Sequence, residues 1–194
     1  MSQPTFDING RICLITGATS GLGRQFALCL AGAGAQVVIT GRRAERLEDL
    51  KAEIEAAGGE AISNGGSVTE YEQMEKMVAD AKQKWGGVHI LINNAGVLRD
   101  KTFHKMTPDD FEFVLKVHLT GSAFVTKACW ETFREQAYGR VLMTASSTGL
   151  FGNFGQANYG AAKLGLIGLT KTLQLKDTKY NIHYNSLSPI ATHI

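Results

Sequence analysis

The sequence predicts a doubly wound α/β fold, in which a parallel β-sheet carries helices on both faces. Three observations support this class. Short β-branched runs alternate with longer helical runs along the chain, the short runs are apolar enough to be buried on both faces, and the helical runs are long enough for right-handed crossovers. With 194 residues and no repeat, linker or low-complexity tract, residues 1–194 are expected to form one domain.

Six short runs are predicted to be strands. They cover residues 11–16 (RICLIT), 36–40 (QVVIT), 60–64 (EAISN), 88–92 (VHILI), 139–145 (GRVLMTA) and 182–187 (IHYNSL). Six parallel strands separated by helices make a Rossmann sheet, for which the expected strand order is 3-2-1-4-5-6.

The helical segments between these strands have recognisable ends. Residues 47–57 place leucine, isoleucine and alanine at a helical period that stops at the glycine pair 58–59. Thr69 and Glu72 match a capping box. Residues 107–110 (TPDD) provide an N-cap, a first-turn proline and two acidic side chains, so a helix is expected to begin there.

Composition favours a protein that acts on small ligands. Hydrophobic residues make up 44% and charged residues 20%, and a net charge of +2 is too small to indicate a nucleic-acid or membrane surface. Cys13, Cys29 and Cys129 are widely spaced among apolar neighbours, so buried free thiols are expected rather than a disulfide or metal site. No signal peptide or membrane span is expected. These features favour the cytoplasm or another reducing compartment, the peroxisome included.

The first predicted strand runs directly into a glycine-rich turn, TGATSGLGR at 16–24, and then into the helical run QFALCLAGAG. Glycines at a strand-to-helix turn let the backbone approach a diphosphate, whose charge meets the free N–H groups of the helix. The alternative is a tight turn that needs glycine only for positive φ. The candidate dinucleotide contacts here are Gly17, Thr19, Ser20, Gly21, Leu22 and Gly23.

Three motifs in the same order resemble the short-chain dehydrogenase/reductase family: the G-x-x-x-G-x-G turn, NNAG at 93–96 and Y-x-x-x-K at 159–163. The resemblance covers essentially the whole chain. The segments NNAGVLRD, VHLTG and GNFGQANYGAAKLGL are most similar to 3-hydroxyacyl-CoA dehydrogenase modules of multifunctional β-oxidation enzymes and to 3-oxoacyl reductases. This resemblance implies a nicotinamide dinucleotide cofactor. It also implies cofactor contacts at Asn94, Ala95, Gly96 and Pro189.

The end of the second strand bears on which dinucleotide binds. Enzymes that use NAD commonly place a carboxylate there to hold the ribose hydroxyls, but this chain has Gly41, followed by Arg42 and Arg43. Arg42 could form charge-assisted hydrogen bonds to a 2′-phosphate, worth roughly 1.5 to 3 kcal/mol. We therefore expect NADP(H), with NAD(H) as the alternative. Arg43 is expected to be solvated. If Arg42 were solvated as well, there would be no reason to expect NADP(H) over NAD(H).

Tyr159 and Lys163 lie four residues apart, so a helix places them on one face. At about 4 Å and an effective dielectric constant of about 20, an ammonium contributes on the order of 4 kcal/mol, or about three pKa units. That would bring the tyrosine pKa toward about 7, provided that the lysine and the positively charged nicotinamide outweigh the opposing effect of burial. Alone, a Tyr-x-x-x-Lys pair is also common on solvated helices. The resemblance implies that Tyr159 donates the proton during reduction and that Lys163 grips the nicotinamide ribose.

The resemblance implies two further catalytic residues. Ser146, thirteen residues before Tyr159, would hold the substrate carbonyl, although its hydroxyl could instead bond its own turn, and spacing alone separates it from Ser147 and Thr148. His118 stands where most members have an asparagine that holds a water near the lysine, and the β-oxidation subgroup also tends to have histidine. Protonated His118 would place a second cation near Lys163 and lower activity in mild acid. The alternative is a packed helix histidine.

The sequence thus predicts an NADP(H)-dependent oxidoreductase acting on a carbonyl or secondary alcohol, with a 3-oxoacyl or 3-hydroxyacyl thioester as the leading substrate. The alternatives are another ketone, sugar or steroid, or a silent dinucleotide-binding subunit. The helix around Tyr159 is apolar almost all round, which predicts a homodimer or homotetramer built on it and on the helix after Thr107. Family members usually continue past Ser188-Pro189 with a substrate lid and a last strand, whereas this chain has Ile190 in place of a common glycine and stops at Ile194. Either the chain is shortened or incomplete, or another subunit completes the substrate wall.

Overall fold

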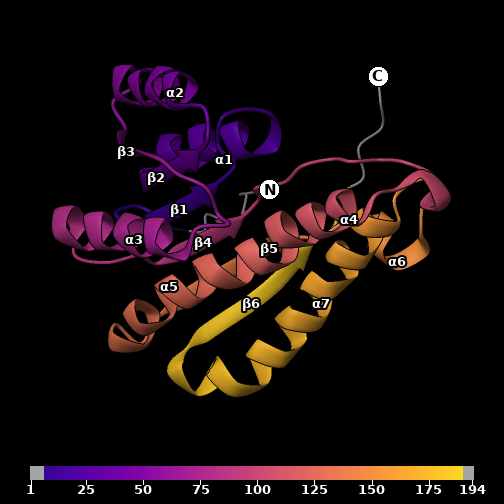
Figure 1. Cartoon of the computed structure of the whole chain (residues 1–194). Coiled ribbons are helices and arrows are strands. Elements are labelled where there is room, and N and C mark those ends of the chain that lie inside the picture. Colours follow the sequence, from indigo (N-terminus) through magenta and orange to yellow (C-terminus); the bar gives the residue numbers. More distant parts are fainter. Residues whose placement is uncertain (1–6, 190–194) are drawn as a thin grey trace, which may run out of the picture.

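A computed structural model describes residues 7–189 of the chain as a doubly wound α/β domain (Figure 1). Its six strands lie in the order β3-β2-β1-β4-β5-β6 and all pair in parallel, as predicted. The strands are β1 (Ile12–Thr16), β2 (Gln36–Gly41), β3 (Glu60–Gly65), β4 (Ile90–Asn93), β5 (Gly139–Thr144) and β6 (Ile182–Leu187). The helices are α1 (Gly21–Gly32), α2 (Ala44–Ala56), α3 (Tyr71–Trp85), α4 (Pro108–Leu115), α5 (Gly121–Glu135), α6 (Ser147–Phe151) and α7 (Ala157–Asp177).

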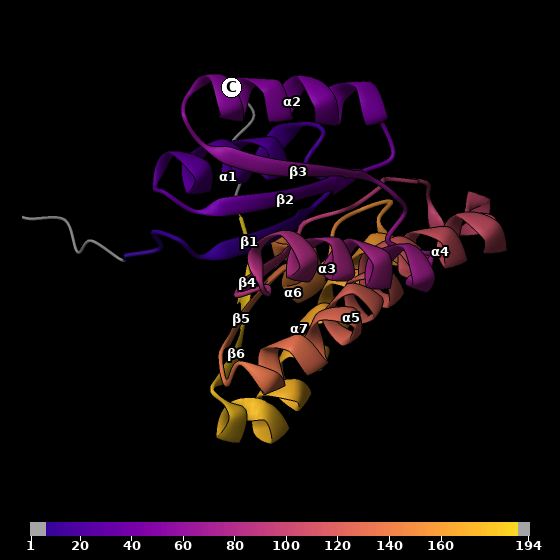
Figure 2. The same cartoon turned by 90° about the vertical axis from the view of Figure 1, so that its left-hand side faces the viewer.

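Two cores lie on the two faces of the sheet because successive strand residues point in opposite directions. In β1, Cys13 and Ile15 belong to the core under α1 and α2, whereas Ile12 and Leu14 belong to the core under α3, α5 and α7. Figure 2 shows α1 and α2 on one side of the sheet and α3, α5 and α7 on the other. The strands are therefore apolar on both faces, as a sandwiched parallel sheet requires.

The helix starts follow the predicted signals only in part. Thr107 accepts a hydrogen bond from the Asp110 N–H at 3.1 Å and caps α4, as predicted. The predicted capping box of Thr69 and Glu72 is wrong, because α3 begins at Tyr71 and the Thr69 hydroxyl bonds instead within its own loop.

A π-helical turn at Lys116–Thr120 joins α4 to α5 and makes one long, interrupted helix. Short 3₁₀ turns lie at Phe103–Lys105 and Thr178–Tyr180. The three cysteines are free, but Cys29 is exposed, so the prediction of burial holds only for Cys13 and Cys129. Across residues 7–189, no helix combines the length and apolar character needed to cross a membrane.

Candidate active site

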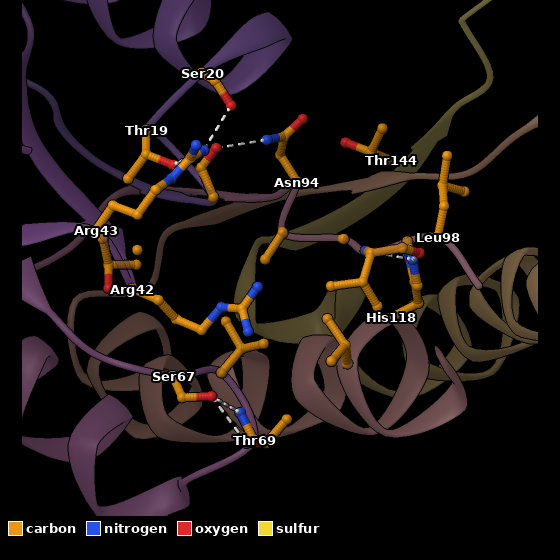
Figure 3. Close-up of a pocket in the computed structure, with 18 of the residues that line it drawn as sticks. Thr19, Ser20, Arg42, Arg43, Ser67, Thr69, Asn94, Leu98, His118 and Thr144 are labelled. Carbon is orange, nitrogen blue, oxygen red and sulfur yellow. Dashed lines mark hydrogen bonds between the residues drawn. The ribbon is translucent and has the colours of Figure 1, made fainter. Parts of the chain in front are cut away.

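A cavity of about 950 Å³ lies at the carboxyl ends of the strands, where doubly wound sheets bind their ligands (Figure 3). Its walls come from the turns after β1, β2, β3 and β4, from the end of β5 and from the start of α7. The predicted residues that line it are Gly17, Thr19, Ser20, Leu22, Arg42, Asn94, Ala95, Gly96, His118, Tyr159 and Lys163. The topology therefore gathers most of the predicted site residues around one space.

The turn between β1 and α1 leaves its backbone open. Gly17 has φ +67°, and a Cβ on it would lie 2.7 Å from the Cα of Ala95. Ser20 is the N-cap of α1 but makes no side-chain capping bond, and the first turn carries no acidic residue. The free N–H groups and positive end of α1 therefore suit an anionic diphosphate, so these residues fit a dinucleotide.

Gly23 serves packing more than ligand contact, since it does not line the cavity. A Cβ at this position would lie 2.4 Å from the carbonyl oxygen of Gly17 and 2.5 Å from Nδ2 of Asn94. Gly21 also lies outside the lining and has φ +56°, which favours glycine. Both residues therefore act by shaping the turn.

Asn94 is tied to this turn from the next strand. Its Nδ2 donates to the carbonyl oxygens of Thr16 at 3.1 Å and Gly17 at 3.2 Å. The hydroxyl of Thr16 accepts from the backbone N–H groups of Asn94 and Ala95, each at 3.0 Å. The Asn94 amide thus holds the turn after β4 against the turn after β1. Thr16, which we did not predict, holds the same two turns together through its hydroxyl.

The end of the cavity near α2 is basic. Arg42 reaches from the β2–α2 turn toward the middle of the cavity, opposite Ser67 and Thr69 of the loop after β3 (Figure 3). Arg43 is not simply solvated, because its Nη2 donates to Thr19 Oγ1 at 2.8 Å and to Ser20 Oγ at 3.0 Å. One guanidinium group, that of Arg43, therefore contacts the glycine-rich turn, and the other, that of Arg42, extends into the cavity.

Tyr159 and Lys163 lie in the first turns of α7 at the other end of the cavity. Lys163 is buried, and its Nζ donates to the Thr144 carbonyl and lies 5.4 Å from the Tyr159 ring centroid. Burial lowers the pKa of Lys163 to about 8. Its side chain is therefore held in one place, over the ring of the tyrosine.

In the chain alone, the Tyr159 pKa is not lowered; the predicted lowering needs the nicotinamide charge as well as Lys163. Burial raises the pKa of Tyr159, the Ser146 hydroxyl lowers it, and the Asp100 carboxylate raises it. The Lys163 ammonium faces the ring and is engaged by the Thr144 carbonyl, so it does not offset burial. In this state Tyr159 carries its proton, as a proton donor must.

Ser146 lies beside the cavity and performs two tasks. Its Oγ accepts from the Thr148 N–H at 3.2 Å and thereby caps α6, which is the alternative raised by the sequence. It also lies close enough to the Tyr159 phenol to lower the pKa of that group. Ser146 is thus within reach of the phenol even though it does not line the cavity in this state.

His118 sits on the π-helical turn, buried against Gly96. Its ring meets that of Tyr159 edge-on at 5.2 Å, and its Nε2 lies 2.8 Å from the Val97 carbonyl oxygen and 3.0 Å from the Val97 nitrogen. A Cβ on Gly96 would lie 2.4 Å from Cε1 of His118. Within the described part of the chain, Nδ1 of His118 and Oγ1 of Thr144 are buried without a partner, so two polar atoms near Lys163 remain available.

The predicted loss of activity in mild acid through His118 also needs correction. Burial and then the Lys163 ammonium lower the pKa of His118 to about 4, against a smaller opposing effect of its Val97 hydrogen bond. The folded chain therefore keeps the imidazole neutral through mildly acidic pH. Any effect of His118 protonation on activity is expected near pH 4.

This shift predicts a pH dependence of stability. Between the folded pKa of about 4 and the ordinary value of 6.5, the unfolded chain binds more protons at His118, so stability rises with pH. From pH 7 to pH 5 the wild type should lose about 2 kcal/mol of unfolding free energy more than a His118→Asn variant. Urea unfolding at both pH values measures the difference. Equal losses in the two proteins would show that His118 is not the group responsible.

The last predicted residue of the site lies apart from the cavity. Pro189 follows β6 and is half-buried, but it does not line the cavity. Ile190 and the chain end at Ile194 lie outside the described residues. Conversely, the sequence reasoning missed the loop after β3, where Gly66, Ser67, Val68 and Thr69 line the cavity. The strand order alone could have indicated that loop, because its strand ends at the same edge of the sheet.

Comparisons with known proteins agree with this geometry. Residues 11–193 match the family model described as short chain dehydrogenase. A Mycobacterium tuberculosis protein described as a short-chain type dehydrogenase/reductase is 49% identical over 193 residues, covering 95% of this chain and 68% of the relative. The peroxisomal multifunctional enzyme type 2 of Mus musculus is 43% identical over 192 residues, but they make up only 26% of that enzyme. The crystal structure of NAD⁺-bound xylitol dehydrogenase, 36% identical, superposes with a TM-score of 0.91, covering 94% of this chain and 70% of that one.

Proposed function

Since the chain belongs to the short-chain dehydrogenase/reductase family, we propose that it is an NADP(H)-dependent oxidoreductase that interconverts a carbonyl and a secondary alcohol. The observation that carries this proposal is the convergence of Tyr159, Lys163 and Ser146 at one end of a cavity whose other end is basic and borders the glycine-rich turn. When bound, the dinucleotide supplies or accepts the hydride at the carbonyl carbon.

The protein's own residues handle the proton and the orientation of the substrate. During reduction Tyr159 donates its phenolic proton to the carbonyl oxygen, and the Ser146 hydroxyl holds that oxygen by a hydrogen bond. Lys163, released from the Thr144 carbonyl, would hold the nicotinamide ribose and favour the phenolate left by proton transfer. His118 would hold a water in this relay through its free Nδ1.

We place 3-oxoacyl and 3-hydroxyacyl thioesters first among the substrates. The support is the similarity of the segments around Asn94, His118 and Tyr159 to dehydrogenase modules, together with relatives named peroxisomal multifunctional enzyme and hydratase-dehydrogenase-epimerase. Since this chain spans about a quarter of those enzymes, their full activities are not transferred. Another ketone, sugar or steroid is the second candidate, favoured by the xylitol dehydrogenase neighbour.

Turnover provides the direct test of this function. Mixing the protein with NADPH and acetoacetyl-CoA should consume the absorbance of reduced nicotinamide, and NADH should serve less well. Reduction of a sugar or steroid ketone but not of the thioester would assign the second candidate. Tight NADPH binding without turnover of any carbonyl would identify a silent dinucleotide-binding subunit.

The preference for NADP(H) predicts a specific effect at Arg42. Without Arg42, the charge-assisted bonds to the 2′-phosphate are lost, and the preference for NADPH over NADH should fall about ten- to a hundredfold in kcat/KM. The Arg46→Ala variant, which removes an exposed arginine from the first turn of α2, is the control. An unchanged ratio in Arg42→Ala would overturn the NADP(H) assignment and favour NAD(H), the cofactor named for the xylitol dehydrogenase neighbour.

We further propose a homodimer or homotetramer built on α7 and on the helix after Thr107. Two apolar residues of α7 support this, because large exposed apolar side chains are typical of contact surfaces: Leu164 is 51% exposed and Leu175 is 88% exposed. A monomer at micromolar concentration in sizing measurements would contradict the proposal. A reducing compartment, the cytoplasm or the peroxisome, remains the expected location, and relatives named as peroxisomal support the second.

A further inference from the structure

Two phenylalanines stand unusually exposed near the reacting residues. Phe103, in the 3₁₀ turn after β4, is 74% exposed, and Phe154, in the loop before α7, is 86% exposed. Both line one groove of about 570 Å³, hereafter the Phe103–Phe154 groove. Single exposed apolar residues are ordinary, but large ones gathered in a hollow mark a binding surface.

The Phe103–Phe154 groove adjoins the candidate active site. Its walls are Lys101, Thr102, Phe103, His104, Asn153, Phe154, Gly155 and Ala157. The segment after β4 lines the main cavity as far as Leu98 and this groove from Lys101 onward. Asn153 Nδ2 of the groove and the Thr148 hydroxyl both donate to Gln156 Oε1, at 2.9 and 3.1 Å, and the Thr148 N–H donates to Ser146 Oγ at 3.2 Å, so hydrogen bonds connect the groove to the reacting serine. A substrate whose carbonyl lies at Tyr159 could therefore extend along the same two segments into the groove.

Hydrogen bonds between these two segments form the groove in advance. The Lys101 N–H donates to the Gly155 carbonyl at 2.9 Å, and Gln156 Nε2 donates to Asp100 Oδ2 at 2.8 Å. The walls are thus fixed before any ligand arrives, which is how small-molecule sites are usually built. The exposed rings therefore line a preformed groove and not a flat contact surface.

The chemistry of the walls distinguishes the two ends of an acyl thioester. The coenzyme A end carries several phosphate charges and needs unpaired cations. Lys101 is the one lysine or arginine among the described residues of the groove, and its Nζ is paired with Asp110 Oδ2 at 2.8 Å. The aromatic rings instead suit a hydrocarbon, whose affinity grows with the apolar surface removed from water.

We propose that the Phe103–Phe154 groove binds the hydrocarbon tail of the acyl thioester, so that the protein prefers longer acyl chains to the four-carbon substrate. The inference rests on the proposed function, because the tail belongs to a substrate held at Tyr159. The coenzyme A end leaves the active site by another route.

Binding of saturated thioesters tests the groove without turnover, because these ligands lack the reducible ketone. Each buried methylene contributes about 0.8 kcal/mol, or about fourfold in affinity, and an open groove covers only part of it. Calorimetry with butanoyl-, octanoyl- and dodecanoyl-CoA measures this effect. Affinity should rise about two- to fourfold per methylene between butanoyl-CoA and octanoyl-CoA. A Phe103→Ser/Phe154→Ser variant should lose most of this rise while binding butanoyl-CoA nearly as the wild type does.

The control is Leu175→Ser, which removes an equally exposed apolar side chain near the far end of α7. Because Leu175 also belongs to the proposed subunit contact, this variant is compared at a protein concentration where its subunit number matches that of the wild type, and there the rise should be unchanged. An unchanged rise in the double variant would overturn the proposal. A changed subunit number in the double variant with the rise intact would reassign the rings to contact with a second copy. Turnover of acetoacetyl-CoA is measured separately: its absence removes the proposed function, whereas turnover with no chain-length effect in the wild type removes only the tail site.

Discussion

Replacing Tyr159 with phenylalanine should lower kcat by about 10²- to 10⁴-fold, because the variant lacks the only group assigned to donate the proton. The ring itself remains and keeps its edge-on contact with His118, so the fold and the dinucleotide affinity should be preserved. Stopped-flow measurement of hydride transfer and fluorescence titration with NADPH separate the two effects.

The matched control for this change is Tyr138→Phe, which removes a phenol just before β5. This position lies at the amino ends of the strands, whereas the cavity lies at their carboxyl ends. It should leave kcat unchanged. If Tyr159→Phe retained most of the turnover with normal NADPH affinity, another group would have to supply the proton. Weaker NADPH binding without slower hydride transfer would instead place Tyr159 in cofactor binding alone.

The second large effect is expected at Gly23. In Gly23→Ala the new methyl would lie 2.4 Å from the Gly17 carbonyl oxygen and 2.5 Å from the Asn94 amide, so the glycine-rich turn and its tie to β4 must shift. Overpacking of this kind costs about 1 to 3 kcal/mol, and dinucleotide affinity should fall roughly ten- to a hundredfold. Calorimetric titration with NADPH measures this loss.

Gly32→Ala provides a matched control in the same helix. A Cβ at Gly32 meets nothing within 4 Å, and alanine is the better helix former by about 1 kcal/mol, so this variant should bind NADPH normally and unfold no more easily. Normal NADPH binding by Gly23→Ala would mean that the turn tolerates the shift. The close packing of Gly23 would then not be needed to keep the glycine-rich turn in the conformation that binds the dinucleotide.

The sheet was predictable from sequence because its signal is local and repeated. The six apolar runs fall within about two residues of the observed strands, and β6 matches at both ends. Burial on both faces leaves little choice for such runs. The predicted capping box at Thr69 failed because α3 begins one residue later than the box requires, at Tyr71, and the threonine hydroxyl bonds instead to its neighbours Ser67 and Glu70.

The site was predictable as a set of residues and less so as an arrangement. Glycine spacing and the Tyr159–Lys163 interval indicated the two ends of the cavity, because each follows from a turn or one helix face. The role of Arg43 was not visible, because its partners Thr19 and Ser20 lie on another turn. The raised Tyr159 pKa of the chain alone was also not visible in the sequence, since burial and the Thr144 carbonyl that holds Lys163 depend on the folded chain.

The π-helical turn at Lys116–Thr120 constrains how this segment can tolerate length changes. It holds one more residue per hydrogen-bonded turn than the α-helices on either side, and such turns recur at functional sites. Because the extra residue is taken up within this one wide turn, deleting one residue here would let α4 and α5 fuse into regular helix while keeping their relative orientation, but it would move the residues of the turn itself, His118 among them. The imidazole of His118 would then leave Gly96 and the tyrosine ring. The helix would become more regular, but the imidazole would no longer point into the site.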